Sequence, residues 1–360
     1  MRSYAATRWC LLVALLLPAV SQAAPPIADW LAEAEAVRSS KPARLAELLV
    51  DLDAAVASAT PAQREQVSYL HAYGDAYAGR YASALAEARN LVATSRDPGM
   101  QMRARALIVT VHGLSRHFAE GLRELEALHA GLAETSDVEI RRLALFASAG
   151  LYRQVGQYAL AIRDLDNLIE TAGPLSERDT CLVTQLREEA RQAAGHASGA
   201  DELQAIIDQC LGAGEPLVAN MARFSLARDV ALEGRVSTAI AMLRRWLPEM
   251  EATRYPRLVT DVHSALARWL ADTGDLAGAQ RHAMRAVAEA QGDTSLVPLT
   301  TAHQVLYEIA EERDDLRSAL FHYKRYAEAD KAYLNDVKAR EFAYQIVRRE
   351  TQQQNQQIAL

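Results

Sequence analysis

The stretch Gly156-Gln157-Tyr158-Ala159-Leu160-Ala161-Ile162-Arg163-Asp164-Leu165 predicts a tight turn followed by an amphipathic helix. Apolar residues recur at helical spacing on both sides of this turn: Leu145, Ala149 and Tyr152 before it, and Ala161, Ile162, Leu165 and Leu168 after it. Glycine adopts the backbone angles of a tight turn without strain, so Gly156 separates two helices. The sequence therefore predicts a helical hairpin over residues 145–171.

The same turn recurs along the chain. Clear copies are Gly79-Arg80-Tyr81, Gly234-Arg235-Val236 and Gly274-Asp275-Leu276, and weaker copies are Arg116-His117-Phe118, Gly195-His196-Ala197 and Asp314-Asp315-Leu316. The residues that end these turns lie about 37 to 40 positions apart, which is the period of a helical solenoid: Tyr81, Phe118, Tyr158, Ala197, Val236, Leu276 and Leu316.

A small residue stands three positions after each of these turn-ending residues. The set comprises Ala84, Gly121, Ala161, Ala200, Ala239, Ala279 and Ala319. A large side chain directly after the turn fills the angle between the two helices, and the small residue lets their backbones approach. The fourth copy lacks the large residue because Ala197 occupies that position.

This pattern resembles the tetratricopeptide repeat family, whose signature has a Gly-x-Tyr-type turn followed by alanine. The resemblance covers roughly residues 61 to 326 and departs from the usual ~34-residue period. It implies an all-α fold, a right-handed α-solenoid of about eight helical hairpins that ends in a long C-terminal helix. Helical pairs of the HEAT type, with ~40 or more residues per unit, are the alternative fold.

Composition and charge agree with a helical interaction domain. Half of the 360 residues are apolar but only 6% are aromatic, so the core is built of alanine and leucine in helices. The formal net charge of -7 argues against nucleic acid as a partner.

The first residues predict export. Residues 1–23 contain Arg2 and Arg8, an apolar run over 9–17 and a small-x-small cleavage site ending at Ala23, as in a secretory signal peptide. The alternative is an uncleaved anchor, but the apolar run is shorter than the ~20 residues that span a membrane. We expect a periplasmic protein, tethered to the inner membrane if the chain continues beyond Leu360.

Three segments are expected after the signal peptide. Residues 24–60 predict a capping helical pair, and residues 61–326 the repeats. Residues 327–360 predict an extended helix with a coiled-coil register whose seam is polar in the middle, and hence a possible dimer. The residues of this seam recur every seven positions: Ala339, Ile346, Gln353 and Leu360, and also Phe342, Arg349 and Gln356. This last segment resembles the linker that joins exported tetratricopeptide sensors to the membrane span and cyclase domain of bacterial diguanylate cyclases. The resemblance implies a sensor region in signal transduction.

Motifs for catalysis and cofactors are absent from the sequence. It contains no nucleotide-binding loop, zinc-protease motif, Cys-x-x-Cys pair, nucleophile elbow or Gly-Gly-Asp-Glu-Phe cyclase motif. The nine histidines are scattered, and His112 and His117 do not share a helix face at a spacing of five. We therefore expect no enzyme activity, no cofactor and no metal site.

The first helices of tetratricopeptide hairpins line a concave groove, where the family's partners usually lie. The residues that this chain is predicted to place there are aromatic or carry guanidinium groups: Tyr69, Tyr73, Tyr77, Phe146, Arg153, Phe224, Arg228 and Arg268. Such groups suit an extended peptide, a protein or a small anionic ligand. The alternative is that the tyrosines pack between helices and the arginines are solvated.

Two cysteines, Cys181 and Cys210, remain after removal of the leader. They lie almost symmetrically about the turn at Gly195, and an exported chain sits in an oxidising compartment, so a disulfide is predicted. The alternative is two buried free thiols.

These features predict a non-catalytic extracytoplasmic sensor that binds its ligand in the groove. The alternative function is a free periplasmic scaffold that assembles envelope protein complexes.

Overall fold

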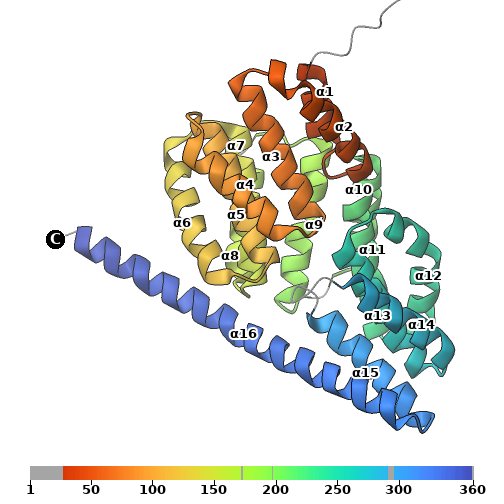
Figure 1. Cartoon of the computed structure of the whole chain (residues 1–360). Helices are drawn as coiled ribbons and strands as arrows, with labels where there is room; N and C mark the ends of the chain where they lie inside the picture. Colours follow the sequence, from red (N-terminus) through yellow and green to blue (C-terminus); the bar gives the residue numbers. More distant parts are fainter. Residues whose placement is uncertain (1–26, 172, 197, 291–295, 359–360) are drawn as a thin grey trace, which may run out of the picture.

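The computed structural model describes residues 27–171, 173–196, 198–290 and 296–358. These residues form 16 α-helices and one short 3-10 helix, and no β-strand is found among them. The predicted signal peptide lies outside this range. Consecutive helices pair into eight hairpins that stack into a curved α-solenoid, as the sequence predicts (Figure 1).

The helices have the following bounds: α1 (Ile27–Val37), α2 (Pro42–Ala55), η1 (Val56–Ser58), α3 (Pro61–Tyr77), α4 (Tyr81–Thr94), α5 (Pro98–Leu114), α6 (Phe118–Glu134), α7 (Val138–Gln154), α8 (Tyr158–Thr171), α9 (Glu177–Ala193), α10 (Ala200–Gly212), α11 (Pro216–Leu232), α12 (Val236–Ala252), α13 (Pro256–Asp272), α14 (Leu276–Glu289), α15 (Leu296–Glu312) and α16 (Leu316–Ile358).

The predicted turns mark where the second helix of each hairpin begins. Six turn-ending residues are the first residue of their helix: Tyr81, Phe118, Tyr158, Val236, Leu276 and Leu316. The small residues that follow are buried, as close helix packing requires: Ala84, Gly121, Ala161, Ala239, Ala279 and Ala319.

The fifth hairpin, α9–α10, which contains the fourth copy of the turn, departs from this register. Its second helix, α10, begins at Ala200 rather than Ala197, and Ala200 is exposed. Leu203, three residues after Ala200, occupies the buried position that the small residue has in the other hairpins, and it is 1% exposed. Without a large residue directly after Gly195, the turn is longer and the helix starts one turn later.

Two turns reach the same backbone conformation without glycine. Gly156 has a φ of +79°, and Arg116 and Asp314 occupy the corresponding positions with φ of 65° and 55°. A non-glycine residue in this left-handed region is strained. Arg116 is stabilised there by contacts of its side chain that are described below.

The first hairpins fold back against later ones. Ser39, just after α1, donates a hydrogen bond to the carboxylate of Glu215 at 2.9 Å and accepts one from Arg178 of α9 at 2.6 Å. The hydroxyl of Tyr77, the last residue of α3, donates to the carbonyl oxygen of Thr253 at 3.1 Å. The solenoid therefore curls far enough for its start to contact hairpins five and six. The repeat period alone does not predict this closure.

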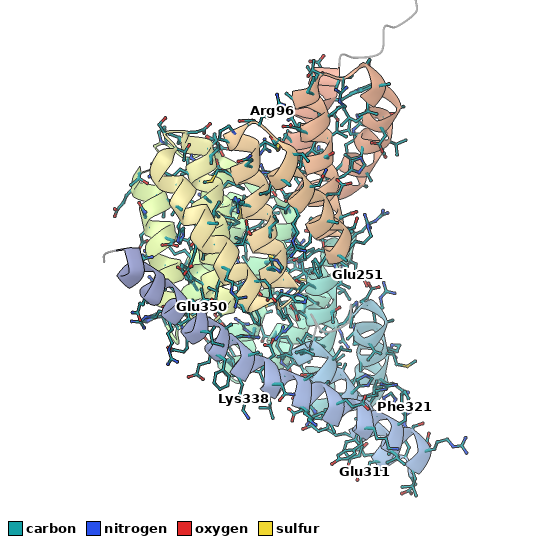
Figure 2. The ribbon with its side chains drawn as sticks, turned by 60° about the vertical axis from the view of Figure 1, so that its left-hand side comes forward. Arg96, Glu251, Glu311, Phe321, Lys338 and Glu350 are labelled. Atoms are coloured by element: carbon teal, nitrogen blue, oxygen red, sulfur yellow. A yellow bond between two sulfur atoms is a disulfide. The ribbon has the colours of Figure 1, made fainter. Side chains whose placement is uncertain are left out.

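The long C-terminal helix is confirmed, and α16 extends over 43 residues. Its first half packs on α15 and its second half crosses to α6 (Figures 1 and 2). Ala343 and Val347 are buried against Phe118 and Leu122 of α6. Asp336 of α16 forms an ion pair with Arg116.

The face of α16 that docks differs from the predicted coiled-coil seam. Ala339, Phe342 and Ile346 of that seam are exposed to solvent, Phe342 at 65% and Ile346 at 47%. Of the helices in the described ranges, none is both long and apolar enough to cross a membrane.

Candidate binding site

The inner side of the solenoid contains a cavity of about 810 Å³. Its wall is formed by the ends of α5, α7 and α9 and by the inward faces of α11 and α13, which are all first helices of their hairpins. The cavity therefore lies where the first helices of tetratricopeptide hairpins form a groove. Its volume is within the range of small-molecule and peptide pockets.

Part of the wall is apolar. Met221 and Phe224 of α11 lie there with Leu258 of α13 and with Tyr255, the residue before that helix. The ring of Tyr77 packs on the ring of Tyr255 with centroids 5.3 Å apart, so the end of α3 holds Tyr255 in place. Burial raises the pKa of Tyr255 to about 12, which keeps its hydroxyl neutral.

The rest of the wall carries charges of both signs. Three arginines and four carboxylates line the cavity: Arg153, Arg228, Arg257, Glu189, Asp229, Glu233 and Asp261. The wall therefore offers no excess of positive charge.

Most of these charges have partners within the wall. Arg153 of α7 lies 3.4 Å from the carboxylate of Glu189. Arg228 donates to the side-chain oxygen of Gln192 at 3.1 Å, and the amide nitrogen of Gln192 donates to Asp229 at 3.0 Å. These contacts join α7, α9 and α11 and fix the spacing of the first helices.

Arg257 and Asp261 differ from the other charges. They lie one turn apart on α13, both are half-buried, and neither has a hydrogen bond or ion pair with another described residue. Burial raises the pKa of the Asp261 carboxyl to about 6, although the nearby Arg257 and Arg228 oppose this shift. A strongly perturbed carboxyl group in a cavity is a candidate functional group.

The predicted groove residues separate into two groups. Arg153, Phe224 and Arg228 line the cavity, and Tyr77 contacts it through Tyr255. The remaining predicted residues, Tyr69, Tyr73, Phe146 and Arg268, do not line it.

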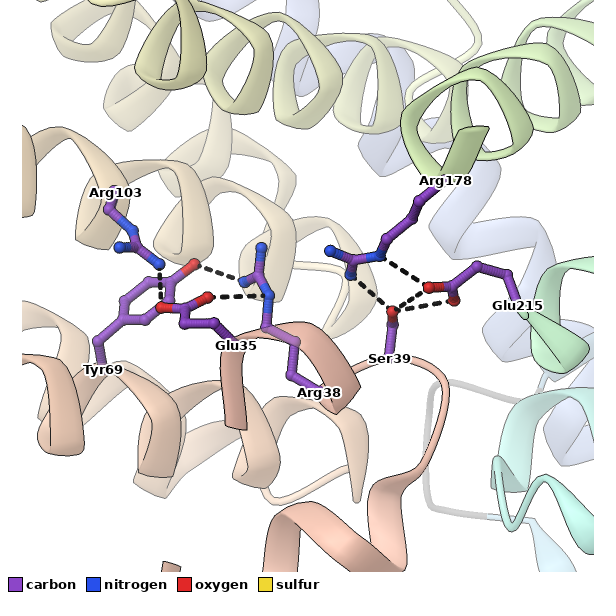
Figure 3. Close-up of polar contacts among 7 residues, drawn as sticks. All are labelled: Glu35, Arg38, Ser39, Tyr69, Arg103, Arg178 and Glu215. Carbon is purple, nitrogen blue, oxygen red and sulfur yellow. Dashed lines mark hydrogen bonds and ion pairs between the residues drawn. The ribbon is translucent and has the colours of Figure 1, made fainter. Parts of the chain in front are cut away.

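Tyr69 belongs instead to a polar cluster at the closure of the solenoid (Figure 3). Tyr69 is 1% exposed, and its hydroxyl accepts a hydrogen bond from Arg38 at 3.0 Å. The guanidinium of Arg103 stacks 4.4 Å from the centroid of its ring, and Arg103 also pairs with Glu35. Arg38 lies 4.6 Å from the ring centroid of Tyr73. These two tyrosines pack between helices, which is the alternative that the sequence left open.

Phe146 and Arg268 have local packing partners. Phe146 packs against the core formed by α7, α8 and α9. Arg268 pairs with Asp272 and with Glu308 of α15, both at 2.6 Å. Arg268 therefore connects neighbouring hairpins outside the cavity.

The sequence did not single out Tyr255, Arg257 and Asp261. A signal for them exists, because proline favours the first turn of a helix and Pro256 is the first residue of α13. Asp261 follows Arg257 by four residues, so the two side chains lie one helical turn apart on the same face of α13. The spacing alone does not reveal that Arg257 and Asp261 lack partners.

A disulfide joins Cys181 of α9 to Cys210 of α10, with the Cα atoms 5.0 Å apart. Both residues are fully buried against Val218 and Ala219 of α11. The bond ties the start of α9 to the end of α10, at the opposite end of this hairpin from its turn and from the α9 residues that line the cavity.

Metal ligation finds no support in the part of the chain that the structure describes, where no group of three or more His, Cys, Asp or Glu residues could hold an ion. Two histidine pairs instead join the helices of the last two hairpins, α13 with α14 and α15 with α16. The Nδ1 atoms of His263 and His282 are 2.8 Å apart, and those of His303 and His322 are 3.2 Å apart.

Comparison with known proteins places the chain by its fold. No family model and no curated protein matches its sequence. A solved Rap protein, complexed with Competence and Sporulation Factor, is 13% identical with a TM-score of 0.55, over 86% of this chain and 99% of that chain. A signal transduction ATPase with numerous domains and a tetratricopeptide repeat sensor, from Pyrococcus horikoshii, is 13% identical with a TM-score of 0.54. That match covers 87% of this chain and 50% of that chain. At this identity the similarity is one of fold, a solenoid of tetratricopeptide-type helical hairpins.

Proposed function

We propose that this chain is a non-catalytic binding module whose ligand occupies the cavity between α7, α9, α11 and α13. The observation that carries the proposal is the pair Arg257 and Asp261, two half-buried charged groups on the cavity wall that make no hydrogen bond or close ion pair with a described residue. Burying charges without partners costs stability, and a bound ligand compensates that cost. A peptide, or the end of a protein chain, has the polar groups and the size for this cavity.

The fold comparisons support a role in recognition by analogy. One neighbour is a Rap protein solved with Competence and Sporulation Factor, and the repeats of the other are described as a sensor. Proteins of this fold present the inner faces of several hairpins to one partner, and that is the arrangement of the cavity wall here.

The finer proposal is an exported sensor of a bacterial signalling system, of the kind associated with membrane-bound diguanylate cyclases. In this proposal α16 transmits the state of the cavity. It is anchored at two places along the solenoid, on α15 of the last hairpin and, through Asp336 and Ala343, on the α5–α6 hairpin, which is the third. A ligand that changes the curvature of the solenoid changes the distance between these anchors.

A free periplasmic scaffold for envelope complexes is the second candidate. The observation that favours it is the apolar surface on the outer side of α16, where Leu320, Leu334 and Phe342 are all more than half exposed. Such a surface suits a protein partner or a second copy of the chain.

The experiment selects ligands with the wild-type protein and compares their binding to a variant whose cavity is filled. Immobilised wild-type protein selects from a displayed library of random short peptides and from a soluble envelope extract. Ala193→Trp fills the cavity from the end of α9 and leaves its charges in place. Ala288→Trp makes the same change on the outer helix α14, where Ala288 is exposed. We expect ligands that bind wild type and Ala288→Trp but not Ala193→Trp. Ligands that bind all three proteins equally would reject the cavity as the site.

A further inference from the structure

The charges on the cavity wall restrict the chemistry of the ligand. The arginine and carboxylate groups nearly balance, and Arg153, Arg228, Glu189 and Asp229 already contact other wall residues. A small dianion would meet more carboxylates than arginines, four against three. The cavity therefore does not suit a purely anionic ligand, which is one of the classes that the sequence suggests.

We propose that the ligand is a short zwitterion with an apolar side chain, a free amino acid or a dipeptide, whose ammonium group pairs with Asp261 and whose carboxylate pairs with Arg257. The inference rests on the proposed function and names the ligand class of the same cavity. It assigns one charge of the ligand to each of the two wall residues that lack partners.

The spacing of the two residues fits this class. Side chains at positions i and i+4 of a helix have Cβ atoms about 5–6 Å apart. An amino acid has its ammonium and carboxylate on one carbon, and a dipeptide separates them by about one further residue of ~3.5 Å. Both charges of such a ligand therefore reach Arg257 and Asp261 at the same time. The termini of a longer extended peptide do not.

The electrostatics favour a ligand that supplies both charges. Asp261 faces Arg257 on its own helix, Arg228 on α11 and Glu189 on α9. Despite the two arginines, burial raises the pKa of this carboxyl to about 6, so its charge is poorly solvated. A ligand ammonium at Asp261 compensates that charge, and the ligand carboxylate does the same for Arg257.

The apolar part of the wall accommodates the side chain. Phe224, Tyr255 and Leu258 lie beside the charged pair and come from α11 and the start of α13. Aromatic and aliphatic side chains bury well against such surfaces. Phenylalanine and leucine are therefore suitable probes.

The experiment is isothermal titration calorimetry on the whole chain with four probes. L-phenylalanine carries both charges, 3-phenylpropionate only the carboxylate, and phenethylamine only the ammonium. The dipeptide L-leucyl-L-phenylalanine carries both at a wider spacing. We expect one of the two zwitterions to bind at least about 10-fold more tightly than either single-charge probe. Tighter binding of L-phenylalanine would identify the ligand as a free amino acid. Tighter binding of L-leucyl-L-phenylalanine would identify it as a dipeptide.

Two variants assign the charges. In Arg257→Gln the affinity for L-phenylalanine falls to that for phenethylamine, and in Asp261→Asn it falls to that for 3-phenylpropionate. Arg285→Gln changes a half-exposed arginine on α14 and leaves all affinities unchanged. Lowering the pH from about 7.5 to about 5 weakens the ammonium-bearing probes in wild type, because Asp261 becomes protonated, but not in Asp261→Asn.

Two results would overturn the inference. One is that 3-phenylpropionate binds as tightly as L-phenylalanine, which would show that the site prefers anionic ligands. The other is no binding of any zwitterion. Neither result tests the proposed function. That function is tested by the ligand selection, in which ligands should bind Ala288→Trp but not Ala193→Trp.

Discussion

Arg116 and Asp336, 220 positions apart, form an ion pair that fastens α16 to the turn between α5 and α6. The Nε of Arg116 donates to the Asp336 carboxylate at 2.6 Å, and Arg340 donates to the same carboxylate at 2.7 Å. Asp336 is only 8% exposed. Arg116 has a positive φ where the clear repeats have glycine. The side chain of Arg116 therefore explains why this turn lacks the glycine of its relatives.

Asp336→Asn should loosen the second half of α16. The substitution keeps the size of the side chain but leaves Arg116 and Arg340 without a carboxylate, which should cost about 1–3 kcal/mol for a largely buried pair. We expect a lower urea midpoint and faster hydrogen exchange of backbone amides over residues 336–350.

The matched control is Glu350→Gln. Glu350 pairs with Arg123 farther along the same helix, but the two side chains are 44% and 51% exposed. Exposed pairs contribute less than about 1 kcal/mol, so this variant should behave nearly as wild type. Equal effects of the two substitutions would show that Asp336 has no special role in docking.

Two glycines of the same hairpin should respond to alanine in opposite directions. Gly156 has a φ of +79°, where a Cβ atom is strained, so Gly156→Ala should destabilise by about 1–2 kcal/mol. Gly150 lies inside α7 with no atom within 4 Å of an added Cβ, so Gly150→Ala should stabilise by about 0.5–1 kcal/mol. Chemical denaturation of both variants tests the assigned turn, and a loss of stability in both would contradict it.

The repeat pattern predicts the hairpins well because each hairpin is a local structure. The glycine, the large residue and the small residue that define a turn lie within about six positions of one another, and packing between adjacent helices selects them directly. The α9–α10 hairpin deviates for the same reason. It lacks the large residue after Gly195, and its second helix begins three residues later than predicted.

Long-range closure is less accessible to sequence reasoning. Ser39 meets Arg178 and Glu215 only because the curvature of six hairpins accumulates to bring them together. Tyr69 lies among residues of the first three hairpins, against Arg38 and Arg103, rather than in the groove. A charge without a partner is recognised only when its surroundings are known.

Reduction of the bond between Cys181 and Cys210 should destabilise the α9–α10 hairpin. The bond closes a loop with a sequence separation of 29, for which the chain-entropy relation gives about 3–4 kcal/mol. We expect the free energy of unfolding to fall by about this amount in dithiothreitol. The double variant Cys181→Ala with Cys210→Ala should be insensitive to the reductant, and a wild type equally insensitive would refute the prediction.

Asp261→Asn should stabilise the protein without ligand, in a pH-dependent way. The folded-state pKa of Asp261 is raised to about 6, so its ionisation opposes folding above that pH. The gain should reach about 1–3 kcal/mol near pH 7.5 and shrink as the pH falls from about 6 to about 4. It should vanish near pH ~3, where the carboxyl is protonated in both the folded and the unfolded state. Thermal unfolding at three pH values measures it, and a gain independent of pH would contradict the raised pKa.

The most direct test of the account is a crystal structure of the chain with the ligand recovered in the selection. We expect electron density for the ligand between α7, α9, α11 and α13, with a positive group of the ligand beside Asp261 and a negative group beside Arg257. Density on the outer helices, or along the exposed apolar side of α16 with the cavity unchanged, would contradict the central claim that the inner cavity is the binding site.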